Sequence, residues 1–547
     1  MNVSSLFNVN GSIGYGAYET PDYPTANNFI KHLDYLNIDR SLVWHIEARD
    51  LNPTSGNKRL LKEISEANVQ ERLYPAFVIT PACYFEYGTV AFLRESLASD
   101  RVKALRIMPS ISRFPIRQIE RLLFELAEFS PVVLWDCGAF PDENDVRDIA
   151  YLAQKMPQIN FALTQKMWPD FGSILDLMWR CTNVYIDISW LHMRDTIELL
   201  ADEFGVERIL FGIGGKAHYG AAIAMLAHAQ ITGEQRELIS HGNIERLLKL
   251  PPLTGKLTEK CGNKLNKPLW NKFQNGEPLN EVNIIDAHGH DGPHPLGWIH
   301  RECTIGGIVR QMDRLGINNL ILSGSSALFG DSLEGNLKLE EKAQPYKDKI
   351  AGYLAFNPRY AGKISPFFDD FFKRDFFIGF KLLPSYWKIP VTDSGYSPVW
   401  EYANSHHLPI LLHTWDDRYN SPAMLTEIVK QYPDAIFLLG HSGGGTTGRL
   451  EAEKLVQDND NVYLEFCGTF TTPVPFEDSA EKVGWDKVVF GSDTNAHSIS
   501  WELGRYLSMP VPDDVLLPGL AENILNVMAA ANGEFHPDAP SIPITIL

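Results

Sequence analysis

Cysteine is scarce in this 547-residue chain, and the cysteines present do not cluster. The six residues form no CxxC pair and are widely scattered, at Cys83, Cys137, Cys181, Cys261, Cys303 and Cys467. Small secreted domains that depend on disulfides use a much denser framework. We therefore expect reduced thiols and a cytoplasmic location.

Long hydrophobic runs and excess positive charge are also missing. No apolar run reaches the roughly 20 residues that cross a bilayer, and the first residues, MNVSSLFNVNGSIG, lack the basic and apolar regions of a secretion signal. Lys and Arg number 49 against 68 for Asp and Glu, a formal net charge of −19. A nucleic acid would meet an unfavourable mean field. We expect neither a nucleic-acid nor a membrane partner, although a local basic pocket for a small anionic substrate remains allowed.

Two nucleophile or phosphate signatures are absent as well. The glycine-rich stretch HSGGG at His441 lacks the Lys-Ser/Thr of a P-loop. The stretch GSSALFG at Gly324 does not match GxSxG, so a serine nucleophile on an elbow turn is not expected.

The chain contains an internal repeat, in which one sequence unit occurs twice. NVNGSIG at Asn8 matches DAHGHDG at Asp286, and NVYIDIS at Asn183 matches NVYLEFC at Asn461. Nine such correspondences occur in the same order, with offsets confined to 275–280 residues. A chain of this length also exceeds the roughly 250–300 residues of one hydrophobic core. The sequence therefore predicts a tandem duplication with two domains.

Within each copy, short β-branched or aromatic runs alternate with stretches of helical period such as Ile305–Gly316 and Pro422–Pro433. Near-continuous apolar strands suit a parallel sheet that is covered on both faces. About eight such units in roughly 250 residues predict an α/β fold of two tandem (β/α)8 TIM-type barrels. We expect one barrel over residues 1–250, a linker over 251–282 and a second barrel over 283–547.

Polar side chains of the second copy gather at its expected strand ends. In a parallel barrel, functional groups lie at the carboxyl ends of the strands. Residues two apart on a strand share a face, so the HxH spacing aims both imidazoles into one mouth. Imidazole and carboxylate groups suit zinc and related divalent metals. The barrel-ordered series comprises His288, His290, Lys381, His413, His441 and Asp493.

At this point the second copy resembles the amidohydrolase superfamily, through DAHGH, LLHTW, LLGHSGG and FGSDT. These motifs are similar to the branch that includes aminocarboxymuconate-semialdehyde decarboxylase-like enzymes. The resemblance implies one divalent metal, usually zinc, bound by His288, His290, His413 and Asp493. It also implies that His441 lies next to the metal-bound water as base or electrophile, and Asp493 could accept a proton as well.

Lys381 has two interpretations. In two-metal relatives a carboxylated lysine on the fourth strand bridges the ions, and the residue order here permits that. The flanking motifs resemble the one-metal branch, which favours a single ion. We then expect Lys381 to bind an anionic substrate group; an ion pair with a neighbouring carboxylate is the structural alternative.

The loops after the strands of the second copy supply the other substrate-binding candidates. Aromatic walls with a few polar groups suit a small, partly planar or carboxylated molecule. The candidates beside Lys381 are Arg418, Trp415, Tyr386 and His294. Arg418 and Lys381 are the best candidates for binding an anion.

The first copy has lost each of these groups. By the aligned segments, the six positions carry Asn10, Ser12, Arg106, Trp135, Gln165 and Gly214. We expect this barrel to hold no metal and to act as a pseudoenzyme domain, packed against the second barrel as an intramolecular pseudo-dimer. Two alternatives are that it only stabilises its neighbour, or that Arg106, His45 or Trp135 recognises a ligand.

Three functions remain open for the whole chain. The first is a metal-dependent hydrolase that attacks a small amide, lactone or ester with metal-activated water. The second is a non-oxidative, metal-dependent decarboxylase of a small carboxylated substrate, because the resemblance supports both reactions. The third is a non-catalytic ligand-binding protein, and the intact ligand series of the second copy argues against it.

Overall fold

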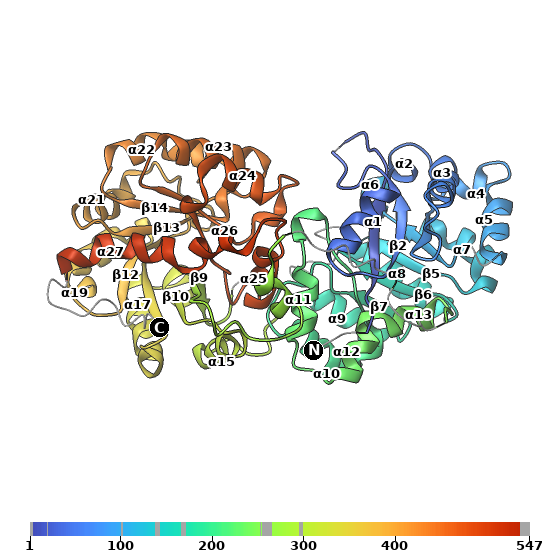
Figure 1. Cartoon of the computed structure of the whole chain (residues 1–547), viewed down its shortest axis with the longest axis horizontal. Helices are drawn as coiled ribbons and strands as arrows, with labels where there is room; N and C mark the ends of the chain where they lie inside the picture. The colour runs from blue at the N-terminus through green and yellow to red at the C-terminus, as the bar shows by residue number, and fades with distance from the viewer. Residues whose placement is uncertain are drawn as a thin grey trace. The chain divides into compact units, whose positions relative to one another are not determined.

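The structure is a computed structural model that describes residues 4–18, 20–99, 102–136, 143–165, 171–251, 253, 257, 265–294 and 299–535. The chain divides into two compact units (Figure 1). The first unit comprises Met1–Lys264 and Leu296–Arg301, and the second comprises Leu265–Pro295 and Glu302–Leu547. In the part of the chain that is described, no helix has both the length and the apolar character needed to span a membrane.

The first unit contains an eight-stranded parallel sheet in sequential order. The backbone N–H of Val9 donates to the carbonyl of Phe211 (3.0 Å), which brings the first strand to the end of the last. The strands are β1 (Phe7–Ile13), β2 (Arg40–His45), β3 (Leu73–Val78), β4 (Ala104–Ile107), β5 (Val132–Asp136), β6 (Asn160–Thr164), β7 (Val184–Asp187) and β8 (Ile209–Leu210).

The second unit repeats this arrangement with its own eight-stranded parallel sheet. Ala287 donates to the carbonyl of Phe490 (3.1 Å), and a parallel bridge joins Gly289 to Thr494. The strands are β9 (Ile285–Asp291), β10 (Asn319–Gly324), β11 (Ile350–Ala355), β12 (Phe377–Leu382), β13 (Pro409–His413), β14 (Ile436–Gly440), β15 (Val462–Glu465) and β16 (Val488–Val489). The predicted pair of TIM-type barrels is confirmed.

Helices alternate with the strands in both units (Figure 1). The first unit has α1 (Ala26–Tyr35), α2 (Ile46–Asp50), α3 (Pro53–Glu66), α4 (Ala82–Phe85), α5 (Thr89–Ala98), α6 (Pro109–Ser112), α7 (Glu120–Leu126), α8 (Glu143–Lys155), α9 (Phe171–Arg180), α10 (Thr196–Phe204), α11 (Ala221–His228), α12 (Gly233–Glu237) and α13 (Asn243–Leu247). The second unit has α14 (Pro268–Phe273), α15 (Ile305–Leu315), α16 (Ser325–Phe329), α17 (Ser332–Ala343), α18 (Ala361–Ile364), α19 (Phe368–Phe372), α20 (Pro384–Trp387), α21 (Ser397–Ser405), α22 (Thr426–Gln431), α23 (Thr446–Asp458), α24 (Phe476–Val483), α25 (Ile499–Leu507), α26 (Asp513–Leu517) and α27 (Asn523–Phe535).

Helix α15 shows how local sequence fixes these boundaries. Thr304 caps its start by accepting from the N–H of Gly307, and Gly316 ends it with a left-handed φ of 83°. A threonine side chain satisfies an otherwise unpaired N–H at the first turn, and glycine adopts positive φ without steric cost. The segment that is expected to be helical from Ile305 to Gly316 is therefore confirmed.

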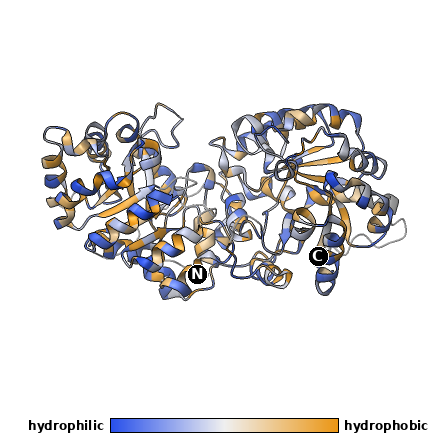
Figure 2. Cartoon of the chain, turned by 180° about the vertical axis from the view of Figure 1, so that it is seen from behind, coloured by the Kyte–Doolittle hydropathy of each residue, from blue (hydrophilic) through white to orange (hydrophobic). Residues whose placement is uncertain are grey.

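Apolar strands fill the interior of each barrel (Figure 2). One core cluster combines Phe7, Val9, Ala104 and Leu134 with side chains from the other strands of the first barrel. Its counterpart in the second barrel includes Ile285, Leu411 and Val489. Residues i and i+2 of a strand share a face, so the side chains that continue these interior rows towards the strand ends point into the mouth.

A helix occupies part of the predicted linker over 251–282. Helix α14 belongs to the second unit, and its Leu269 N–H donates to Asp513 (2.6 Å). The buried ammonium of Lys267 pairs with the same carboxylate at 2.9 Å. The second half of the segment is thus tied to the second barrel.

Strand register corrects one of the correspondences between the barrels. Asp136 pairs with Thr164 as His413 pairs with Gly440, and Thr164 and Gly440 are equivalent in the sequence repeat. The counterpart of His413 is therefore Asp136, and the assignment to Trp135 was wrong. A slip of one residue moves a side chain to the opposite face of the sheet, so Trp135 does not continue the interior row.

Candidate metal centre

The two histidines of β9 are held by an aspartate just before them. Asp286 is fully buried and accepts the backbone N–H of His288 (3.2 Å) and of Ser492 (2.8 Å), as well as the Ser492 hydroxyl. These bonds tie β9 to the chain that leaves β16. Burial raises the pKa of Asp286 to about 7. Asp286 thus fixes the two strand ends on which the histidines and Asp493 stand.

Asp493 reaches both histidines from the end of β16. Its Oδ1 lies 2.9 Å from Nε2 of His290 and 3.5 Å from Nε2 of His288, and donor atoms of all three residues lie within 4.8 Å of one another. Asp493 also has a left-handed backbone with φ 58°. Such a conformation costs a non-glycine residue about 1–3 kcal/mol and concentrates at functional sites.

Hydrogen bonds behind the imidazoles decide which ring nitrogen faces Asp493. Nδ1 of His288 lies 3.1 Å from the Glu465 carboxylate, which accepts an N–H from it. The Ser323 hydroxyl donates to a backbone carbonyl, so its oxygen accepts from Nδ1 of His290 at 2.8 Å. Both rings therefore present an Nε2 lone pair towards the Asp493 oxygen.

This donor set fits a divalent metal. Two nitrogen lone pairs and a carboxylate oxygen converge at 2.9 and 3.5 Å, and a cation among them would remove their mutual repulsion. Burial lowers the pKa of His288 well below its ordinary value. Burial opposes ionisation of Asp493, yet its pKa lies well below the usual range, so the group is a carboxylate. Neutral imidazole and carboxylate are the forms that ligate zinc and related ions.

Lys381 reaches into the same centre from β12. Its Nζ lies 2.6 Å from Nε2 of His288, and both side chains are fully buried. Burial lowers the pKa of Lys381 to about 8, because a low-dielectric surrounding disfavours the ammonium. The ammonium donates to the lone pair that a metal ion would also use, so Lys381 lies among the predicted metal ligands.

His441 lies beside the His288 ring, and His413 lies beside His441. The His441 ring centroid is 5.3 Å from that of His288 and 4.6 Å from that of His413. Nδ1 of His441 lies 3.2 Å from the Cys467 carbonyl, to which it donates, so its Nε2 carries the lone pair. Burial lowers the pKa of His441 to about 4, which keeps the ring neutral at pH 7. Among the described residues, the donor groups within 4.8 Å of one another do not include His413, so its ligand role stays a prediction.

Three of the predicted substrate-binding residues connect to these rings. Trp415 stacks on His413 with centroids 5.8 Å apart and an interplanar angle of 5°. Tyr386 meets His413 edge-on at 5.1 Å, and His294 lies 6.1 Å from Tyr386. Arg418 is exposed, and its guanidinium donates to the neighbouring Tyr419 hydroxyl at 2.7 Å. The described contacts therefore bring Trp415, Tyr386 and His294 to the centre but do not bring Arg418.

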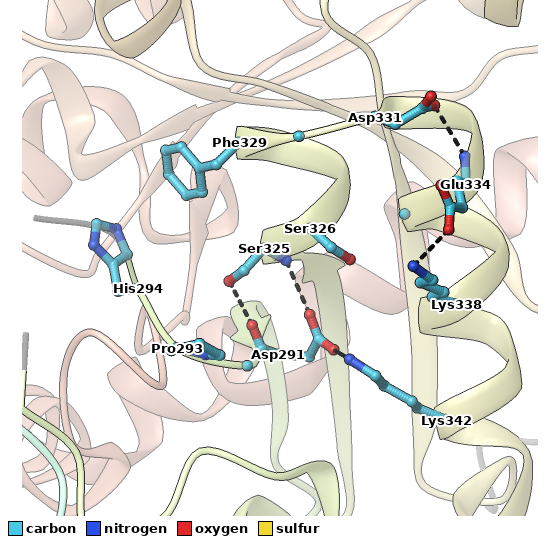
Figure 3. Close-up of a pocket in the computed structure, with 13 residues that line it drawn as sticks. Asp291, Pro293, His294, Ser325, Ser326, Phe329, Asp331, Glu334, Lys338 and Lys342 are labelled. Carbon is cyan, nitrogen blue, oxygen red and sulfur yellow. Dashed lines mark hydrogen bonds and ion pairs between the residues drawn. The ribbon is translucent and has the colours of Figure 1, made fainter.

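A pocket of about 480 Å³ lies beside the ends of β9 and β10 (Figure 3). Its two lysines are both paired, Lys342 with Asp291 at 3.0 Å and Lys338 with Glu334 at 2.6 Å. His294 also lines this pocket and contacts Tyr386. The aromatic contacts of Tyr386 with His294 and with His413 thus connect the pocket to His413. The pocket wall carries no surplus of positive charge among its described residues.

Sequence reasoning missed two residues of this centre. Glu465 ends β15 and is fully buried against Nδ1 of His288. The sulfur of Cys467 lies 3.2 Å from the same nitrogen and 3.4 Å from Nδ1 of His441. The signal was present in NVYLEFC, where an acid ends the seventh strand of the copy, but the segment served only to align the repeat.

The first barrel places different groups at the same positions. Arg106 takes the place of Lys381, and its Nη2 donates to Asn10 at 2.9 Å across the barrel. A Cβ at Gly214, the counterpart of Asp493, would clash with the ring of His218. His218 therefore fills the space that a carboxylate would need.

Comparison with known proteins agrees with this architecture. A family model described as amidohydrolase matches residues 79–250 and 337–524, together more than half of the chain. The chain belongs to the amidohydrolase family. The two matched stretches of this amidohydrolase fall in separate barrels, in keeping with a tandem duplication. No curated protein matches the chain.

Solved structures that resemble this amidohydrolase align over less than half of it. An uncharacterized TIM-barrel protein from Bordetella bronchiseptica is 16% identical, with 46% of this chain and 100% of that chain covered and a TM-score of 0.37. A 5-carboxyvanillate decarboxylase from Sphingomonas paucimobilis is 12% identical, with 45% and 99% covered and a TM-score of 0.36. A probable 2-pyrone-4,6-dicarboxylic acid hydrolase from Acinetobacter baumannii is 15% identical, with 45% and 100% covered and a TM-score of 0.37.

Proposed function

We propose that the second barrel is a metal-dependent hydrolase of a small amide, lactone or ester. The observation that supports this is the convergence of two imidazole lone pairs and the Asp493 carboxylate, with the imidazoles oriented from behind by Glu465 and Ser323. His288, His290 and Asp493 would hold one zinc ion, with His413 as a further ligand. The first barrel, which lacks this donor set, is proposed to be catalytically inactive.

A divalent metal in such a site supplies Lewis-acid polarisation of a carbonyl and lowers the pKa of water towards about 7. The chain's own residues move the proton. His441 is neutral and its Nδ1 is committed to the Cys467 carbonyl, so its Nε2 accepts a proton from water. This orientation favours the base over the electrophile. The Asp493 carboxylate, whose pKa lies well below the usual range, is the weaker of the two bases.

Substrate selection falls to the aromatic side chains and to Lys381. Trp415 and Tyr386 flank the His413 ring and offer apolar faces to a small planar group. Lys381 is a buried cation that binds an anionic group of the substrate once it leaves His288. The proposed substrate is therefore a small carbonyl compound that also carries a planar or carboxylated part.

The experiment is a panel of lactones, esters and amides offered to the full chain before and after chelation. We expect hydrolysis that is lost on chelation and restored by Zn²⁺. His441→Asn should lower kcat by about 10²–10⁴-fold because the base is removed, while the zinc content stays the same.

Product analysis separates this reaction from decarboxylation. Release of carbon dioxide from a carboxylate in the same panel, without any hydrolysis, would contradict the proposal and identify a decarboxylase. A zinc-replete protein that turns over nothing would favour a binding protein.

A further inference from the structure

Three consecutive loops at the mouth of the first barrel carry large apolar side chains that face solvent. The loops follow the carboxyl ends of β1, β2 and β3. Single exposed apolar residues are ordinary on a protein surface, but a group of them in one place marks an interaction site. We call this group the loop patch, and its members are 68% to 106% exposed: Tyr15, Tyr18, Leu51, Phe85 and Tyr87.

Hydrogen bonds hold the three loops side by side. The N–H of Ala17 in the first loop donates to the Asp50 carboxylate in the second at 2.9 Å. The Asn52 amide in the second loop donates to the Glu86 carboxylate in the third at 2.7 Å, and the Thr54 hydroxyl donates to the same carboxylate at 2.7 Å. Each of these residues except Thr54 is the sequence neighbour of a patch residue. The loop patch is therefore continuous from the β1 loop, across the end of α2, to the end of α4 (Figure 1).

The carboxylates between the apolar side chains are already satisfied inside the chain. Asp50 pairs with Arg49 at 2.6 Å, and Glu86 also accepts from the Thr89 hydroxyl at 3.1 Å. A nucleic acid or an anionic membrane needs a basic surface. Here it would meet two carboxylates on a chain with a formal net charge of −19. These charges favour a protein surface as the occupant of the loop patch.

The area of the loop patch matches what one side of a dimer buries. The exposed fractions amount to about four whole side chains, and a large side chain buries roughly 200 Å². The loop patch thus offers about 800 Å² from each copy, which is one side of a standard protein–protein interface. Tyr and Phe are enriched in such interfaces. An apolar surface is also complementary to itself, as the two-fold contact of a homodimer requires.

We propose that the loop patch is the contact between two copies of this chain, which pair about a two-fold axis through their first barrels. The contact uses no residue of the second barrel and does not depend on the hydrolase proposal. It gives the barrel without the metal-binding donor set a function of its own, which is to hold two copies of the second barrel in one particle.

Light scattering after size exclusion measures the mass of the full chain at several concentrations. We expect a particle of twice the 61.6 kDa of one chain. The double variant Phe85→Ser, Tyr87→Ser should weaken dimerisation at least about thirtyfold, because two aromatic anchors are removed. The matched control is Trp179→Ser on α9, an aromatic residue of the same barrel that is 59% exposed outside the loop patch. This control should leave the dimer intact.

Amide hydrogen exchange locates the contact without any substitution. Residues 14–18, 50–52 and 84–88 should exchange more slowly at concentrations where the dimer forms than after dilution. Thermal unfolding of the double variant, measured at a concentration where both proteins are single chains, should match the wild type, because these side chains face solvent in one copy.

Three results would overturn the proposal: a single-chain mass at every concentration, a dimer that the double variant leaves unchanged, or equal weakening by Trp179→Ser. A single chain that binds vesicles of phosphatidylcholine and phosphatidylserine would also overturn it and assign the loop patch to a membrane surface. The mass is measured without metal or substrate, so failure of the hydrolase proposal remains distinguishable.

Discussion

Both barrels carry a cationic side chain at the end of the fourth strand, but the two side chains differ in their hydrogen bonds. In the second barrel Lys381 donates to His288, and in the first barrel Arg106 donates to Asn10, the counterpart of His288. A contact from the fourth strand to the first is therefore present in both barrels. The difference lies in the size of the cation: Lys381 has one ammonium group, whereas Arg106 has a guanidinium whose Nε and Nη1 meet no acceptor among the described residues.

The backbone around these groups differs much less than the side chains. The first strand of each barrel has a register shift at the same place, and Asn8 accepts the N–H of Asn10 as Asp286 accepts that of His288. A bulge re-aims side chains at a strand end. The comparison therefore teaches that the scaffold of the site and its chemistry are separable.

The largest expected effect is the loss of activity when a predicted metal ligand of the second barrel is replaced. His290→Ala should lower kcat/KM at least about a thousandfold, because a site that has lost a ligand loses several kcal/mol of charge stabilisation. Ser12→Ala, the matched change in the first barrel, should leave turnover within twofold, or about 0.4 kcal/mol. The measurement is kcat/KM for the hydrolysed substrate. Equal losses of kcat/KM in both variants would contradict the proposal that only the second barrel is catalytic.

The next effect concerns the acids that end the seventh strands. Asp187 is fully buried, and burial raises its pKa to about 7. The folded state therefore holds a proton that the unfolded chain releases near pH 4, so stability falls as pH rises from about 4 to 7. Asp187→Asn should flatten this fall by up to about 4 kcal/mol.

Urea unfolding at pH 4, 6 and 8 measures that difference. The control is Asp176→Asn on the exposed surface of α9, where Asp176 pairs with Arg180 at 2.9 Å. Its effect should stay within about 0.5 kcal/mol at every pH. Parallel pH profiles for the wild type and Asp187→Asn would show that Asp187 ionises without cost.

A smaller effect tests whether His218 occupies the space of a side chain at position 214, the counterpart of Asp493. Gly214→Ala should destabilise the protein by about 1–3 kcal/mol, because the new Cβ overlaps the ring of His218. The double variant with His218→Ala should recover part of this loss in a double-mutant cycle. Additive losses in thermal unfolding would mean that His218 does not fill the place of Asp493.

The smallest effect sharpens the role of the missed acid. Glu465→Gln should weaken zinc binding about 10–100-fold, because the partner that orients His288 loses its charge. Asp187→Asn at the equivalent position should leave the zinc affinity unchanged. Chelator competition measures both, and equal zinc affinities in Glu465→Gln and the wild type would assign Glu465 to packing alone.

Much of this architecture was predictable from the sequence, because a repeat constrains strand order twice. The HxH pair, Asp493 and His441 could be placed at strand ends, since alternation along a strand fixes which residues share a face. Register within a strand end was harder to infer. Trp135 and Asp136 are adjacent, and only the pairing of β5 with β6 shows which one replaces His413.

The hydrogen bonds that orient the imidazoles of His288 and His290 could not be predicted from the sequence. Glu465 and Ser323 lie on other strands than the two histidines whose Nδ1 atoms they contact, at sequence separations of 177 and 33 residues. Nor could the sequence indicate that Arg418 bonds to its own neighbour, Tyr419. Such contacts depend on side-chain direction, which periodicity does not specify.

One backbone dihedral angle is nearly the same in the two barrels at the end of the sixth strand. Gln165 has φ 59°, close to the 64° of His441 at the equivalent position. A glutamine gains nothing evident from a left-handed backbone, which a non-glycine residue adopts at a cost. The left-handed conformation at the end of the sixth strand is therefore common to both barrels and does not depend on a histidine side chain.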